Sequence, residues 1–395
     1  VTLSGIDDQV TQEFQIKSKA DSAINWILGA YYLHSKAGFS PSQLAGDALS
    51  GIAPGTVQQR TGIQMINSYS VYGQATAPIA DNTNLTLGLR FTRDEVSGRG
   101  DSFLIIPGVG TVPAAPVYTD SETFEEPTWK AAIDHHFTED LMAYASVSRG
   151  YKAGTFNTGS LDTPPAKPEI VDAYEIGMKS EFADSRIRLN GAVFWNEIKD
   201  PQVITFITKG LVASQGLTNA QKARVKGAEI GIEALATDAL KLRGAATYLD
   251  AKFVDFNPAP FYSLGPVNVI GPVAGDASGN SLPNVPELRF DVGANYTVDN
   301  SFGEWVGDVS AAYTDEFAWN ADNRVAEKAV TLVNASLSFT PSSKDYLTFR
   351  IWGNNLGDVE YYAASQEFSG PAGTGGDIAM VAAPRTYGAS ISVKY

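Results

Sequence analysis

The chain has 395 residues, of which 44% are hydrophobic and 18% are charged, and its net charge at pH 7 is −15. Cysteine is absent, which excludes a disulfide framework, a cysteine zinc site and a thiol nucleophile. The acidic balance argues against nucleic acid as a partner, because binding to phosphates needs a basic surface.

No apolar run reaches the roughly 20 residues that a membrane helix requires. The segment Ala23–Leu33 comes nearest, and Asn25 and Gly29 interrupt it. A membrane protein with this sequence would therefore cross the bilayer with strands of a closed barrel.

Apolar and polar residues alternate with a period of two in segment after segment, which predicts β-strands. Between Leu85 and Phe91, for example, every second residue is apolar, and Arg90 lies on the opposite face. About fifteen strands are expected from this pattern. They are Asp8–Ser18, Ala23–Lys36, Ile63–Ala77, Leu85–Thr92, Thr123–Asp134, Leu141–Phe156, Glu169–Phe182, Arg186–Lys199, Lys222–Leu235, Leu240–Phe256, Glu287–Val298, Glu304–Trp319, Ala329–Thr340, Asp345–Asn355 and Arg385–Tyr395.

The connections alternate between tight turns, such as Ala183–Ser185, and long loops rich in glycine and proline. The long loops include Ala37–Gly62, Gly100–Ser121 and Leu356–Pro384. Outer-membrane barrels have short periplasmic turns and longer external loops. The sequence therefore predicts an all-β, transmembrane, antiparallel up-and-down barrel in the bacterial outer membrane.

The last strand is apolar on one face and polar on the other. Its apolar face carries Tyr387, Ile391, Val393 and Tyr395, which we expect to meet lipid and to act as a signal for the barrel-assembly machinery.

An odd number of strands cannot close into an antiparallel up-and-down barrel, and single-chain bacterial barrels have even numbers. We therefore expect residues 1–395 to form a single domain that is the C-terminal portion of a larger barrel, incomplete at its N-terminus and beginning in an external loop.

Five segments resemble motifs of TonB-dependent outer-membrane receptors. Ser148–Asn157 resembles their SRGYKxGxFN strand, Tyr174–Lys179 their YEIGxK strand, and Phe194–Asp200 the F(Y/W)xxxKD strand that follows. Asn354–Tyr362 resembles NNLxDxxYY, and Pro384–Gly388 resembles the PRxxG opening of the last strand. The segments occur in the family's order, and the resemblance spans essentially the whole chain.

The resemblance implies a barrel of about 22 strands that holds a plug in its lumen. It also implies energised uptake of a scarce solute, an iron–siderophore type of chelate first of all, with energy delivered by the TonB complex. The plug, which would contact TonB, is not in this sequence. Alternatives are a receptor for a carbohydrate or vitamin, a passive substrate-specific porin, and a structural or adhesive barrel.

Aromatic residues in the predicted external loops are the candidates for binding a small-molecule ligand, because recognition sites place apolar surface on loops above a rigid scaffold. These candidates are Phe261, Tyr262, Trp319, Tyr361, Tyr362 and Phe368. The alternative for each is packing between loops.

No catalytic constellation is visible, and no G-x-S-x-G elbow is present, so the chain is not expected to be an enzyme. His135 and His136 lie in a predicted periplasmic turn, where a solvated turn is a better explanation than a metal or haem site. We expect no metal and no cofactor.

Overall fold

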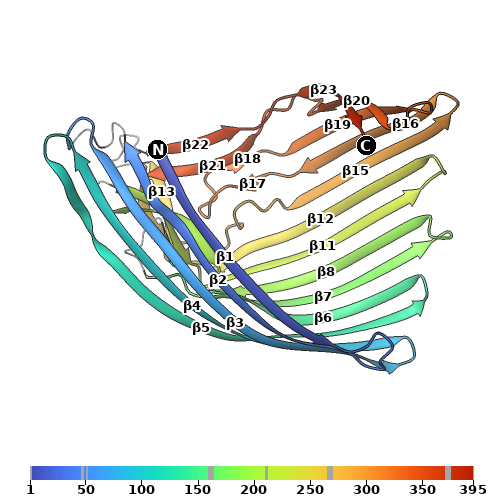
Figure 1. The fold of residues 1–395 in the computed structure, drawn as a ribbon, viewed down its shortest axis with the longest axis horizontal. Coiled ribbons are helices and arrows are strands. Elements are labelled where there is room, and N and C mark those ends of the chain that lie inside the picture. The colour runs from blue at the N-terminus through green and yellow to red at the C-terminus, as the bar shows by residue number, and fades with distance from the viewer. Residues whose placement is uncertain are drawn as a thin grey trace.

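The computed structural model describes residues 2–45, 49, 52–158, 164–209, 212–264, 270–369 and 375–394. Fifteen strands form one antiparallel sheet in which neighbours in sequence pair in order (Figure 1). They are β1 Thr2–Lys17, β2 Asn25–Ala45, β3 Val57–Ala80, β4 Thr83–Ile106, β5 Gly110–Thr138, β6 Leu141–Lys152, β7 Glu169–Phe182, β8 Ile187–Lys199, β11 Lys222–Leu235, β12 Leu240–Asp255, β15 Leu288–Asn300, β16 Gly303–Thr314, β19 Val330–Pro341, β20 Leu347–Asn354 and β23 Thr386–Val393.

The sheet curves into a trough, with short turns at one end and the long connections, together with the β4–β5 hairpin, at the other (Figure 1). Each of four long connections contains a two-stranded sheet of its own. The short strands are β9 Gln202–Lys209 with β10 Val212–Asn219, β13 Ala259–Leu264 with β14 Ile270–Gly275, β17 Phe317–Ala318 with β18 Ala326–Glu327, and β21 Tyr362–Ser369 with β22 Gly375–Val381. The predicted strand order is confirmed, and the alternation of short turns and long connections holds except between β4 and β5.

The prediction of a long loop over Gly100–Ser121 is wrong. β4 continues to Ile106, β5 begins at Gly110, and only three residues separate them. Gly108 and Gly110 have φ angles of 79° and 105°, so here glycine shapes a tight hairpin turn. The loop predicted over Ala37–Gly62 is likewise shorter, because β2 extends to Ala45 and β3 begins at Val57.

The two faces of the sheet differ in chemistry. On the outward, convex face large apolar side chains are exposed, among them Val71 at 60%, Leu89 at 70% and Ile176 at 62%. The concave face carries the polar residues that alternate with these apolar residues along each strand. On this face Arg243 Nη1 lies 2.9 Å from Asp308 Oδ2 across the sheet. The register places these other polar residues on the same face: Arg90, Arg188, Asn190, Arg289, Asp291, Asn295, Asn334 and Arg350.

Tyrosines on the concave face lie across glycines of the neighbouring strand. A Cβ atom on Gly29 would come within 2.2 Å of the Tyr72 ring, and one on Gly177 within 2.5 Å of the Tyr144 ring. Each tyrosine hydroxyl also donates to a carboxylate 2.6 Å away, Tyr72 to Glu13 and Tyr144 to Glu175. These glycines are needed because the rings occupy the space of a side chain.

The final strand follows the predicted alternation. Tyr387, Ile391 and Val393 are 82%, 66% and 56% exposed. In the register Ile391 pairs with Phe349, which is also exposed on the outward face. Tyr395 lies outside the described residues, and the role of these residues in assembly stays a prediction.

Replacing Ile391 with lysine is expected to reduce barrel stability by up to about 2–4 kcal/mol, because a charge on the lipid face must be taken out of water. The folded fraction, measured by heat-dependent gel mobility over a urea series, should fall at lower urea. Ser392→Lys is the control, since Ser392 pairs with Thr348 on the polar face. Equal urea midpoints for both variants would contradict the assignment of faces.

Candidate functional site

The long connections gather at the external end of the sheet (Figure 1). β9, β14 and β21 contact one another there, although they come from three different connections. A small apolar core supports them and includes Phe253 and Phe256, which are 1% and 0% exposed. This apolar core, called the packed base below, includes Phe253 of the wall strand β12 and therefore joins the connections to the wall.

Asparagine side chains join two of these connections through the backbone. Asn280 Nδ2 donates to the Ala321 carbonyl at 2.9 Å. Asn323 accepts from the Ser281 N–H at 2.8 Å and donates to the Ser281 carbonyl at 3.0 Å. The segment after β12 and the β17–β18 connection are thus fixed to each other. No local sequence pattern indicated these residues.

Trp319 lies in this joined region. Its ring packs edge-on against Phe317, with centroids 4.9 Å apart. Within the described structure, neither the buried indole Nε1 of Trp319 nor the Nδ2 of the adjacent Asn320 has a hydrogen-bond partner. Two buried donors without partners are costly, so this pair marks a place in the connections where the protein leaves hydrogen-bonding capacity unused.

The other candidate aromatics lie in different surroundings. Phe261 packs against the apolar core, so its ring supports the connections. The Tyr361 carbonyl accepts from Ala382 N–H at 2.9 Å, and the Tyr362 ring is 46% exposed. The side chains of Tyr262 and Phe368 lie outside the described part of the structure.

The last two long connections are held together by charge. Arg324 donates to both carboxylate oxygens of Asp377, at 2.6 and 3.0 Å. Nearby, Glu327, only 6% exposed, accepts from the Tyr362 N–H at 3.0 Å. β17–β18 and β21–β22 are therefore expected to move together.

Breaking this link is expected to loosen both connections. In a double-mutant cycle with Arg324→Ala and Asp377→Ala, we expect a coupling energy of about 0.5–3 kcal/mol, as for contacting residues of one ion pair. Protease cleavage rates of the two connections report it. A control cycle with the exposed pair Arg186 and Asp238, which lies in the short turns at the opposite end of the sheet, should leave the cleavage rates of both connections unchanged. Additive effects for Arg324 and Asp377 would show that the connections move independently.

Charge in the external connections is mostly negative. The hydroxyl and N–H of Ser278 hold the pKa of Asp276 below its usual value, so this carboxylate stays ionised to a lower pH than a free aspartate. Among the described residues, no group of three or more histidine or acidic side chains is placed to hold a metal ion.

The sequence motifs near the chain's end connect to each other. Asn355 accepts from Val359 N–H and donates to its carbonyl, both at 2.9 Å. Asp358 accepts from the N–H of Arg385 at 3.0 Å. The segments Asn354–Tyr362 and Pro384–Gly388 are thus structural, because they fix the two ends of the last connection.

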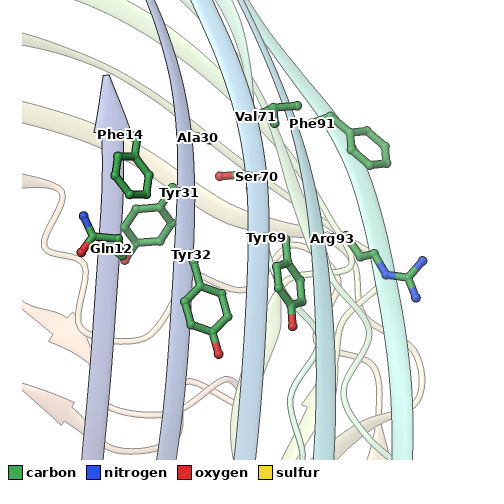
Figure 2. Close-up of a pocket in the computed structure, with 10 residues that line it drawn as sticks. All are labelled: Gln12, Phe14, Ala30, Tyr31, Tyr32, Tyr69, Ser70, Val71, Phe91 and Arg93. Atoms are coloured by element: carbon green, nitrogen blue, oxygen red, sulfur yellow. The ribbon is translucent and has the colours of Figure 1, made fainter. Parts of the chain in front are cut away.

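A groove of about 440 Å³ lies on β1 to β4 (Figure 2). Most of its lining residues point outward in the register, including Phe14, Tyr32, Tyr69 and Phe91. The Tyr32 and Tyr69 rings lie 5.3 Å apart. Because the groove opens on the apolar outer face, it belongs to the aromatic girdle of the membrane interface and not to the path of a solute.

A curved, antiparallel sheet of this kind, apolar outside and polar inside, defines the wall of an outer-membrane β-barrel. The described part of the chain contains no helix with the length and hydrophobicity to cross a membrane. The family model described as "TonB dependent receptor-like, beta-barrel" matches residues 2–356. The chain belongs to this family, and its place is the bacterial outer membrane. Because the family consists of receptors and transporters, the expectation that the chain is not an enzyme is confirmed.

Relatives in the curated proteins carry receptor names. A probable TonB-dependent siderophore receptor, PiuA of Acinetobacter baumannii, is 24% identical over 307 residues, covering 75% of this chain and 37% of that protein. A probable TonB-dependent receptor, BfrD of Bordetella pertussis, is 27% identical over 332 residues, covering 78% of this chain and 40% of that protein. The chain therefore spans less than half the length of these relatives.

Solved structures share the fold. The ferric yersiniabactin uptake receptor FyuA from Yersinia pestis superposes with a TM-score of 0.77 at 17% identity, over 100% of this chain and 55% of that chain. The siderophore receptor PiuA from Acinetobacter baumannii gives 0.73 at 20% identity, over 99% and 57%. The prediction of a TonB-dependent receptor barrel is confirmed.

Proposed function

We propose that this chain is the C-terminal part of the barrel of an energised receptor that takes up an iron–siderophore type of chelate. The observation that carries the proposal is the packed group of external connections, with aromatic rings and buried donors, on a wall of this family. Relatives named as siderophore receptors support the choice of solute.

The external connections and the concave face have different functions in this proposal. The external connections capture the solute, and the polar concave face provides a wetted wall beside the path. Energy would come from the TonB complex through a plug that belongs to another part of the protein. The barrel-assembly machinery would insert the wall by recognising its final strand.

Uptake in iron-starved cells tests the proposal. The full-length gene product, expressed in a strain without other siderophore receptors, should accumulate a labelled ferric siderophore from a panel of catecholate, hydroxamate and carboxylate types. Accumulation should cease when TonB is deleted. Uptake that continues without TonB would indicate a passive pore, and uptake of none of the panel would overturn the solute class.

Trp319→Phe is expected to weaken solute binding about two- to tenfold, because a smaller aromatic ring remains while the indole N–H, whose hydrogen bond is worth about 0.5–1.5 kcal/mol, is removed. Equilibrium binding of the labelled chelate to whole cells measures the change. Trp305→Phe is the control, since Trp305 is 38% exposed on the outer face and stacks on Phe339. An unchanged dissociation constant for Trp319→Phe would remove its indole N–H from the site.

A further inference from the structure

A basic patch interrupts the acidic surface of this chain on the outward face of β8, β11 and β12. The register aligns three successive rows of outward residues across these strands. The rows are Trp195–Lys226–Asp250, Glu197–Arg224–Lys252 and Lys199–Lys222–Asp255. Five cations against three carboxylates leave the patch at +2 in a chain whose net charge is −15.

The patch adjoins the band of exposed apolar side chains on the outward face, which is called the apolar belt from here on. The next rows on the same strands, toward the tight turns, are Val193–Ala228–Tyr248 and Gly191–Ile230–Ala246. Val193 and Ile230 are 55% and 52% exposed there, as lipid-facing side chains are. Because β8 continues into the external hairpin β9–β10, the patch lies at the external edge of the belt, at the level of lipid head groups.

The side chains of the patch are arranged around Trp195. The Arg224 guanidinium carbon and Lys226 Nζ lie 5.0 and 5.7 Å from the Trp195 ring centroid. Lys226 and Lys252 share one carboxylate, that of Asp250, at 3.0 and 3.1 Å. Lys222 pairs with Glu197. The carboxylates hold the cations in place without neutralising all of them.

A second charged group at the edge of the apolar belt has an excess of negative charge. On β4 and β5, Arg93 follows Phe91 on the outward face, and it pairs with both Glu95 at 3.0 Å and Glu125 at 2.8 Å. One cation with two carboxylates has no excess positive charge. The charged group on β4 and β5 therefore does not share the excess positive charge of the rows over β8, β11 and β12.

We propose that the rows over β8, β11 and β12 bind the phosphate-bearing head group of an anionic membrane lipid, with the acyl chains against Val193 and Ile230. Lysine and arginine next to a membrane attract anionic lipids, and the aromatic Trp195 suits the interface between chains and head groups. A soluble acidic protein would not require an apolar belt directly beneath the cations.

Lipid association of the full-length protein in phosphatidylcholine vesicles tests this inference. Electron spin resonance with spin-labelled phosphatidylglycerol or phosphatidylcholine gives the preference for the anionic lipid. The triple variant Lys199→Gln, Arg224→Gln and Lys252→Gln should lower this preference at least tenfold, because each cation contributes about fivefold (~1 kcal/mol). The preference of the native protein should also vanish in about 1 M salt, where the screening length is about 3 Å.

Two controls keep the result specific. The swap Lys199→Arg, Arg224→Lys and Lys252→Arg preserves charge and should keep the preference. Arg93→Gln should keep it too, because that group carries no excess positive charge. The inference is overturned if the native protein has no anionic preference, if the triple glutamine variant retains it, or if Arg93→Gln lowers it equally.

Discussion

Replacing Phe156 with alanine should release the segment after β6 from the barrel wall and lower its local stability by about 3–5 kcal/mol, as for other buried phenylalanines. Phe156 is 3% exposed and packs against Val96, which is 1% exposed. A Cβ atom on Gly98 would come within 2.8 Å of its ring. The Phe156 ring therefore packs closely against Val96 and Gly98 of β4, and its loss would leave a cavity.

The backbone around Phe156 depends on the same docking. Gln64 Oε1 on β3 accepts from the Phe156 N–H at 2.6 Å and from the Thr155 hydroxyl at 2.9 Å. Hydrogen exchange of residues 153–157 is the measurement, and protection there should fall while β3 and β4 keep theirs. Phe302→Ala, at a site 76% exposed in a tight turn, is the control and should change nothing. Unchanged protection in Phe156→Ala would mean that Gln64 alone holds the segment.

The strands of the wall could be predicted because each depends on a local pattern. A period of two places Arg90 and Leu89 on opposite faces of β4 whatever the rest of the chain does. Tight turns are also local, since Asn82 and Asp184 adopt positive φ angles of 57° and 54° without help from distant residues. For this reason the strand order and the two faces were correctly expected.

The lengths of the strands could not be predicted in the same way. Glycine and proline after Gly100 resembled a loop, yet β4 and β5 continue there because each supplies the other's hydrogen bonds. The short hairpins such as β21–β22 are a similar case, since pairing within a connection satisfies backbone groups that would otherwise need water.

The candidate site depends on contacts between segments that are distant in sequence. Gln64 reaches Phe156, and Asn280 reaches Ala321, so no spacing rule could find these residues. Residue type and position in predicted loops did identify the candidate aromatic residues. They could not separate Phe261, which packs into the core, from Trp319, whose indole nitrogen lacks a partner in the described structure. The role of these aromatics in binding stays a prediction.

The apolar core beneath the external connections can be tested through Phe253. The ring is 1% exposed and lies 5.0 Å from the ring of Phe256. Its backbone N–H and carbonyl also pair with Asn280 and Gly279, at 2.9 and 2.8 Å. Phe253→Ala is therefore expected to cost about 3–5 kcal/mol, mainly in the connection that follows β12.

This variant separates assembly of the wall from capture of the solute. The strands of the wall keep their backbone pairing in this variant, so heat-dependent gel mobility should stay native. Protease cleavage within residues 256–287 should rise strongly. Binding of a ferric siderophore should weaken in parallel, because loosened connections must be ordered again when the solute binds. Phe349→Ala, at a site 42% exposed on the outer face, is the matched control and should leave both cleavage and binding unchanged. Native binding together with rapid cleavage would show that capture does not depend on the packed base, and the solute site would then have to lie deeper, on the concave wall.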